Sequence, residues 1–127
     1  MAACNSGQGV KMKIIRLYTG ADGESHFEDI DIPLEFGGKI GDLSKPQKAT
    51  GVIFRETTDD YNYDWHNAPR KQYIIMLDAG VEIEVGDGTR RIINPGEILL
   101  AEDTTGRGHI SRALNRKPRK SVFITLE

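Results

Sequence analysis

The chain has 127 residues, of which 38% are hydrophobic and 28% charged, and its formal net charge is −2 at pH 7. This length favours one domain, and this composition is that of an ordinary globular protein rather than a disordered or fibrous one. Because the charge is nearly balanced, no basic field attracts nucleic acid or an anionic membrane, and neither is expected as a partner. One Cys and three His exclude an internal disulfide and any zinc site that needs several of these ligands.

Residues 1–12 are mostly small and polar and contain no apolar run long enough for a signal peptide or a membrane helix. We interpret this stretch as a flexible tail that precedes a domain of residues 13–127. Cys4 lies in the tail and is expected to be a free thiol in a reducing compartment. The expected location is therefore the cytoplasm.

From residue 13 onward, apolar and polar residues alternate in short runs, a pattern typical of strands. The clearest case is 81–85, Val-Glu-Ile-Glu-Val, which would place three aliphatic side chains on one face and two carboxylates on the other. A Gly-Asp-Gly-Thr turn follows, and Asn-Pro-Gly forms a second turn after the return strand. Strands are expected over residues 13–18, 27–32, 52–56, 72–77, 81–85, 90–93, 97–101, 109–113 and 122–126.

Helical periodicity is weak throughout, and residues 34–50, which are rich in Gly, are expected to form a long loop. Residues 115–120 contain four cations beside Pro118, and we interpret them as a solvated turn between the last two strands. About ten short strands at this spacing predict an all-β sandwich or barrel.

Two of the three histidines lie where such a barrel could bring them together. His66 ends the stretch Tyr-Asn-Tyr-Asp-Trp-His and precedes the strand that begins at Gln72, whereas His109 opens a later strand. If the intervening hairpin folds back, both imidazoles point into one cavity. His26 lies far from both in the sequence and is expected to be an exposed or hydrogen-bonded structural histidine.

The stretch 66–112 resembles the barrel of the small single-domain cupins. Their first motif has a His, one residue, a second His, three or four residues, a Glu, six residues and a Gly. In this chain His66 takes the first His position, Ala68 the second, Gln72 the Glu position and Ala79 the closing Gly.

The second cupin motif matches in part. Gly106 and His109 have the required spacing, whereas Thr104 stands where Pro is usual and Ala113 where Asn is usual. The resemblance implies an all-β fold, a single-domain cupin-type β-barrel that is also described as a double-stranded β-helix or jelly roll.

The resemblance also implies a divalent metal ion, Fe, Mn, Ni or Zn, which cupins hold with three His and one Glu. This chain keeps two of the His positions and has an amide at the Glu position, so the expected metal ligands are His66, Gln72 and His109. Two imidazoles and a neutral amide leave the positive charge of the ion uncompensated and leave at least one coordination position for water.

Three acidic residues near the histidines in sequence, Asp64, Glu102 and Asp103, are candidates for a missing acidic ligand. The alternative is a barrel that has lost its metal site and whose cavity binds an organic ligand directly.

Aromatic residues and one cation cluster around His66 in the sequence. An aromatic wall with a guanidinium suits a small carboxylate-like molecule, so the expected substrate-binding residues are Tyr63, Trp65, Arg70 and Tyr73. The competing interpretations are a core or interface role for Trp65 and a surface role for Arg70.

By resemblance, the reactions in reach are those of a metal-dependent dioxygenase, decarboxylase or isomerase acting on a small molecule in the barrel. A second hypothesis is a non-catalytic metabolite-binding module that uses the same cavity. A third is a scaffold that serves oligomerisation, since cupins of this size often form homodimers that cover an exposed sheet edge.

Overall fold

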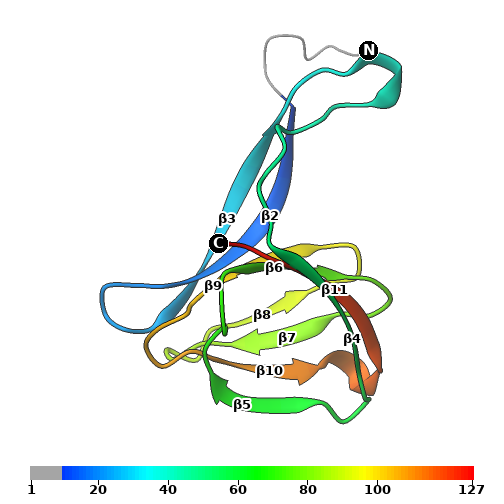
Figure 1. Ribbon diagram of the computed structural model, residues 1–127. Helices are drawn as coiled ribbons and strands as arrows, with labels where there is room; N and C mark the ends of the chain where they lie inside the picture. The colour runs from blue at the N-terminus through cyan, green and yellow to red at the C-terminus, as the bar shows by residue number, and fades with distance from the viewer. Residues whose placement is uncertain (1–9) are drawn as a thin grey trace.

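The computed structural model describes residues 10–127, and strands make up most of this part of the chain (Figure 1). The strands are β2 (Val10–Thr19), β3 (Ser25–Leu34), β4 (Gly51–Thr57), β5 (Asn62–His66), β6 (Gln72–Met76), β7 (Val81–Glu84), β8 (Arg90–Ile93), β9 (Ile98–Glu102), β10 (His109–Ala113) and β11 (Arg119–Thr125). The helical elements of this part are two single 3-10 turns, η1 (Gly38–Ile40) and η2 (Leu114–Arg116). Among the described residues, no helix is long and apolar enough to cross a membrane.

The larger sheet has six strands in the order β3-β2-β9-β6-β11-β4. Its neighbours are antiparallel except for β2 and β9, which run parallel. Strands β2 and β3 are longer than the other strands of the sheet. The end of their hairpin that carries Val10 and Leu34 projects away from the barrel (Figure 1). The other end of this hairpin, at Thr19 and Ser25, lies beside the barrel, where β2 pairs with β9.

The smaller sheet has four strands in the order β5-β10-β7-β8. In β7 the two aliphatic side chains, Val81 and Ile83, are buried and the two glutamates between and after them are half-buried, which confirms the predicted alternation. The β7–β8 turn is closed by a hydrogen bond of 2.8 Å from the Thr89 amide to the Asp87 carboxylate, and Gly88 adopts a φ of 89°. This is the left-handed conformation that glycine tolerates best in a tight turn.

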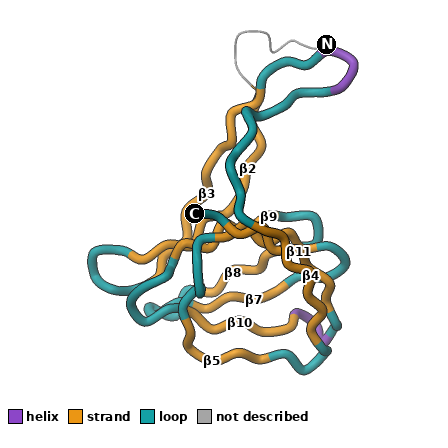
Figure 2. Tube along the Cα trace, in the orientation of Figure 1, coloured by secondary structure: helices purple, strands orange, loops and turns teal. Residues whose placement is uncertain are grey.

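The hydrophobic core lies between the two sheets, which face each other below the projecting hairpin (Figure 2). Burying each of its larger aliphatic side chains stabilises the fold by about 1.5–3 kcal/mol. Both sheets contribute to it through Ile15, Leu17, Met76, Val81, Ile83, Val85, Ile93 and Leu99.

Most predicted strands are present, and the differences concern their ends and one strand that the sequence did not predict. Residues 62–66, for which no secondary structure is predicted from the sequence, form β5 and pair with β10. Strand β11 begins at Arg119, three residues before the expected start at 122, so Arg119 does not lie in the solvated turn. The reason is that β11 pairs with β4 along its whole length, starting at the Arg119–Thr57 pair.

The N-terminal boundary also differs in position. Strand β2 begins at Val10, inside the range assigned to the tail, because Val10 pairs with Leu34 of β3. Cys4 lies outside the described residues. Residues 35–50 form the expected loop, with η1 and one isolated bridge between Glu35 and Leu43.

Candidate functional site

The structure brings His66 and His109 together at the edge of the smaller sheet. They are cross-strand partners in the antiparallel pair of β5 and β10, and the register shifts immediately after them. Their ring centroids are 4.4 Å apart, with a tilt of 56° between the planes. Both side chains line a cavity between the two sheets.

This close approach depends on Gly108, the residue before β10. Gly108 has a φ of 81°, and a Cβ atom there would lie 2.0 Å from the carbonyl oxygen of His66. Only glycine lets the chain enter β10 at this distance from β5.

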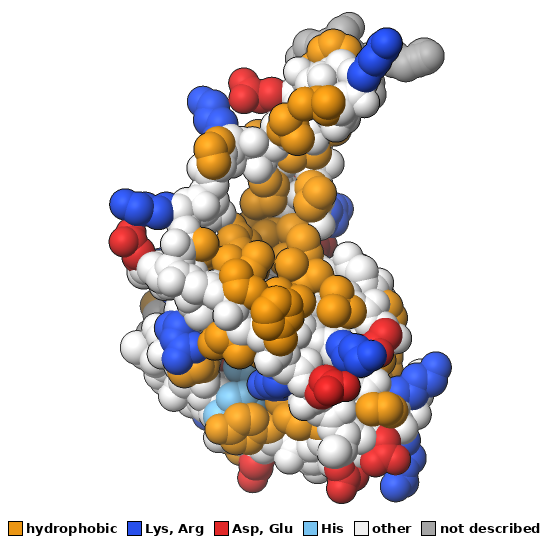
Figure 3. Space-filling model, turned by 45° about the vertical axis from the view of Figure 1, so that its right-hand side comes forward, with side chains coloured by type: hydrophobic (Ala, Val, Ile, Leu, Met, Phe, Trp, Pro, Cys, Tyr) orange, Lys and Arg blue, Asp and Glu red, His pale blue; other side chains and the backbone are white. Residues whose placement is uncertain are grey.

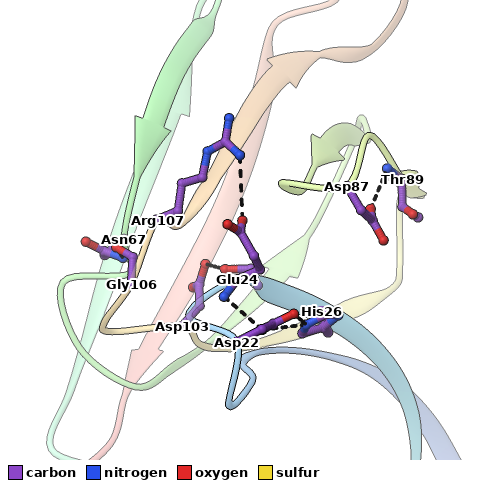
Figure 4. A network of polar contacts seen from close by, with 10 residues as sticks. Asp22, Glu24, His26, Asn67, Asp87, Thr89, Asp103, Gly106 and Arg107 are labelled. Carbon is purple, nitrogen blue, oxygen red and sulfur yellow. Dashed lines mark hydrogen bonds and ion pairs between the residues drawn. The ribbon is translucent and has the colours of Figure 1, made fainter.

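The loop that leads into β10 is fixed from two sides (Figure 4). The Arg107 guanidinium forms an ion pair of 3.8 Å with Glu24, in the turn between β2 and β3. The Asn67 side chain donates a hydrogen bond of 2.9 Å to the Gly106 carbonyl oxygen. These contacts connect the loop to the segments that precede β3 and follow β5.

A buried carboxylate orients the His109 ring. The Asp103 side chain is fully buried and accepts a hydrogen bond of 2.6 Å from Nδ1 of His109 and one of 2.7 Å from the Ser25 hydroxyl. In the neutral ring with its proton on Nδ1, Nε2 of His109 has a free lone pair. A carboxylate behind an imidazole is the arrangement that orients metal-binding and proton-transferring histidines.

His66 is held in the same tautomer by a backbone group. Its Nδ1 lies 2.7 Å from the Asp64 carbonyl oxygen, which can only accept, so Nδ1 carries the proton and Nε2 is unprotonated. Burial lowers the pKa of His66, the hydrogen bond to Asp64 opposes that effect, and the neighbouring His109 lowers the pKa further. His66 is therefore neutral at pH 7 and has a free lone pair at Nε2.

Gln72 adds an oxygen to the two nitrogens. Its side chain is buried at the start of β6, it lines the same cavity, and its Oε1 has no hydrogen-bond partner among the described residues. Ala68, at the second His position of the cupin motif, also lines the cavity and offers only a methyl group. The donor set is thus two imidazole nitrogens and one amide oxygen.

None of the three acidic candidates completes this set. Glu102 pairs with Arg16 at 2.5 Å and with Lys71 at 3.6 Å, away from the histidines. The Asp64 side chain is exposed, and Asp103 is engaged behind His109. Within residues 10–127 no group of three or more His, Cys, Asp and Glu side chains could hold a metal ion.

The cavity has two neighbouring parts, which share some of their lining residues. The inner part, of about 60 Å³, lies between the sheets and is walled by apolar core side chains such as Met76 and Leu99. The outer part, of about 290 Å³, opens to solvent beside Tyr63 and Arg70. The residues that line both parts are Arg55, His66, Asn67, Pro69, Gln72 and Phe123.

The four expected substrate-binding residues separate into two groups. Tyr63 stacks on the His66 ring, with centroids 3.6 Å apart, and lines the outer part of the cavity together with Arg70. Trp65 lies under the Arg107 guanidinium at 4.1 Å, and Tyr73 donates a hydrogen bond to Gln47. Trp65 and Tyr73 do not line the cavity. Trp65 is next to His66 in β5 and Tyr73 is next to Gln72 in β6, and neighbouring side chains of a strand point to opposite faces.

Sequence reasoning missed two arginines that line the inner cavity, Arg55 of β4 and Arg119 of β11. Arg119 is buried because it lies on the same face of β11 as Ser121 and Phe123. This period of two, extended back from the predicted strand, is the signal that could have placed it. The third histidine, His26, is partly exposed and lies 3.0 Å from the Asp22 carboxylate, as expected for a structural residue.

No protein-family model matches the chain, and no curated protein matches it in sequence. Protein NMB1881 from Neisseria meningitidis is a similar solved structure, 18% identical with a TM-score of 0.48, and the match covers 64% of this chain and 79% of that one. The cupin 2 conserved barrel domain protein from Leptotrichia buccalis is 14% identical with a TM-score of 0.46, covering 92% of this chain and 69% of that one.

Two facing sheets, with His66 and His109 lining the cavity between them, form the kind of two-sheet barrel that the sequence predicted. The predicted fold class, an all-β jelly roll, is confirmed, although the two sheets remain separate along their edges. A fold of this kind hosts many reactions and does not by itself specify one.

Proposed function

We propose that this cupin-type protein binds a divalent metal ion through His66, His109 and Gln72 and acts on a small carboxylate-bearing molecule in the adjoining cavity. The observation that supports this function best is that hydrogen bonds favour the same tautomer in both imidazoles. Each has its Nδ1 engaged by an oxygen behind it, so that each offers the Nε2 lone pair that a metal ion needs.

The donor set fits a divalent ion with moderate affinity. The buried Oε1 of Gln72 has no partner among the described residues, and coordination would satisfy it. All three donors are neutral, however, so the charge of the ion needs an anion from elsewhere. An anion bound in the cavity would supply that charge, and the ion and the anion would then bind more tightly together than separately.

A bound ion would supply Lewis acidity or the activation of dioxygen, as in a dioxygenase, decarboxylase or isomerase. Residues of the chain orient and cover the two imidazoles. Asp103 keeps the proton of His109 on Nδ1, and Tyr63 covers the outer side of His66. The apolar wall of the inner cavity excludes water from the reacting end of the ligand.

A second candidate function is the binding of an organic anion without metal. It is favoured by the positive charges of Arg55 and Arg119 in the same cavity, which oppose a divalent cation. In this case the protein captures a metabolite, and the two imidazoles serve as hydrogen-bond acceptors at Nε2.

We also propose that the protein forms a homodimer through the outer face of the larger sheet. Apolar side chains gather there and along the projecting hairpin (Figure 3). Val52 and Phe54 of β4 are 57% and 81% exposed. The shallow groove beside them is lined mainly by Met12, Ile14, Ile32, Tyr73, Ile75, Ile98 and Ile124. A contiguous apolar surface of this kind is typical of an interface.

Elemental analysis of the purified full chain tests the metal proposal. We expect one metal ion per chain in the wild type and in the matched control His26→Ala, whose histidine lies outside the cavity. We expect its loss in His66→Ala and in His109→Ala. Absence of metal from the wild type after incubation with Fe(II), Mn(II), Ni(II) and Zn(II) would overturn the proposal and favour the second candidate.

A further inference from the structure

Two arginines that line the cavity, Arg55 and Arg119, form no ion pair with a carboxylate of the described residues. Arg119 is 4% exposed, and Arg55 is half-buried on the neighbouring strand β4. Both line the inner cavity. No ion pair joins either of them to a carboxylate within residues 10–127, whereas Arg112, on β10, is paired with both Glu82 and Glu84.

Aromatic rings lie beside the two guanidinium groups. Each group lies 5.3 Å from the centre of the Tyr61 ring, and Arg55 also lies 4.8 Å from that of Phe123. Nε of Arg55 and both Nε and Nη1 of Arg119 are buried with no acceptor among the described residues. The Tyr61 hydroxyl is itself engaged with Ser111, 2.7 Å away.

This arrangement is unfavourable for the empty cavity. A buried charge without a partner is costly, and the contacts with aromatic faces offset only part of that cost. Burial and the charge of Arg55 lower the pKa of Arg119, against the opposing effects of Tyr61 and Asp78. An anion that entered the cavity would satisfy the free N–H groups and relieve the repulsion between the two guanidinium groups.

We propose that Arg55 and Arg119 form a subsite for the carboxylate group of the ligand, in the cavity that His66, His109 and Gln72 also line. This inference rests on the proposed function only in that the same cavity receives the ligand, and it does not require a metal ion. Guanidinium groups suit carboxylates because they donate several hydrogen bonds in one plane.

The size of the cavity limits the ligand further. The inner part, of about 60 Å³, has room for a group of only a few atoms. The outer part, of about 290 Å³, has room for a small organic body. The expected ligand is therefore a small carboxylic acid whose carboxylate enters first and whose remaining part lies beside His66 and Tyr63.

Thermal unfolding of the metal-free full chain, dialysed against EDTA, tests this assignment. The probes are acetate, oxalate, malonate and succinate, with succinamide as the neutral counterpart, inorganic phosphate as the other oxyanion, and chloride at equal ionic strength. We expect at least one of the carboxylates to raise the Tm of the wild type, since a ligand of the folded state stabilises it. Succinamide, chloride and phosphate should leave the Tm unchanged.

Three variants separate binding from folding. Arg119→Met and Arg55→Met should weaken the affinity for that carboxylate, measured by calorimetry, by about tenfold or more, because each removes charged hydrogen bonds. The ligand-free Tm of Arg119→Met should lie above that of the wild type, since an unpaired buried charge is removed; a merely structural arginine would lower it. Arg112→Met, the matched control, should lower the Tm and keep the response to carboxylate.

Arg119→Lys, which keeps the charge, serves if a methionine variant does not fold, and it should bind the carboxylate more weakly than the wild type. The proposal is overturned if no carboxylate of the panel stabilises the wild type, if phosphate alone does so, or if the arginine variants retain the wild-type affinity. A carboxylate response that appears only after metal is added, and is unchanged in the arginine variants, also overturns it and assigns the carboxylate to the metal. Absence of metal from the protein leaves this test unaffected.

Discussion

His66 and His109 face each other as cross-strand partners of β5 and β10, and each is held by an oxygen at Nδ1. Strand pairing brings the rings to a centroid distance of 4.4 Å, and the hydrogen bonds decide which nitrogen is left for a ligand. Two imidazoles that both keep a lone pair at Nε2 can bind a cation or accept protons from a substrate. The tautomer of each neutral ring is therefore set before any ligand arrives.

The first prediction concerns the carboxylate behind His109. Asp103→Asn removes the negative charge and can present an amide N–H to Nδ1 of His109, which would shift the ring proton to Nε2. We expect metal affinity to fall by about 10–100-fold, the usual effect of losing such a partner. Competition titration with a chelator measures it. Asp22→Asn, at the carboxylate beside His26, is the control and should leave the affinity unchanged; an equal loss in both variants would contradict this role.

The second prediction concerns the entry into β10. Gly108→Ala places a Cβ atom 2.0 Å from the His66 carbonyl oxygen, in addition to the strain of a positive φ. Gly88→Ala, in the β7–β8 turn, has the strain alone, since nothing lies within 4 Å of its added Cβ atom. Denaturant unfolding should show a loss of about 1–2 kcal/mol for Gly88→Ala and a larger loss for Gly108→Ala. Equal losses would show that β5 and β10 move apart easily.

The third prediction is a pH dependence of stability in the metal-free protein. Because the pKa of His66 in the folded state lies below its ordinary value of 6.5, the unfolded chain binds more protons around and below that pH. The contribution of His66 should therefore destabilise the fold progressively as the pH falls through 6.5 toward the lowered pKa, and be absent above pH 6.5. Difference curves of Tm against pH between the wild type and His66→Gln measure it. A destabilising contribution of His66 that grows as the pH rises would contradict the lowered pKa.

The fourth prediction concerns the homodimer. Phe54→Asp introduces a charge on the outer face of β4, where the side chain is 81% exposed, and should convert the dimer into a monomer. Ile92→Asp, on β8 of the other sheet, is 44% exposed and should leave the dimer intact. Light scattering after size-exclusion chromatography gives the mass, which should be twice 14.1 kDa for the wild type. A wild type that elutes as a monomer would show that this face has another role.

The strands were largely predictable because one face of each is buried and the period of two is visible. The alternation in β7 predicted its inward and outward residues correctly. Strand β5 was not predicted, because aromatic and acidic residues mask its pattern and its pairing with β10 is made between residues far apart in the sequence. Long-range pairing of this kind leaves no local signal.

The site was predictable in part for the same reason. The spacing of the motifs predicts that His66 and His109 lie together. Tyr73, expected among the substrate-binding residues, follows the inward-pointing Gln72 in β6 and lines the groove on the outer face of the sheet. Arg119 was hidden among four cations, which as a group are typical of a solvated turn. A composition of this kind cannot show that one cation of the group belongs to a strand and lies inside the barrel.

Ser25 is the first residue of β3 and shares an Asp103 oxygen with His109. The projecting hairpin and the imidazole are therefore only two hydrogen bonds apart, although the hairpin extends well outside the barrel. The end of the hairpin that carries Ser25 therefore lies against the carboxylate that orients the His109 ring. A partner that displaced β3 would change the hydrogen bonding of that carboxylate.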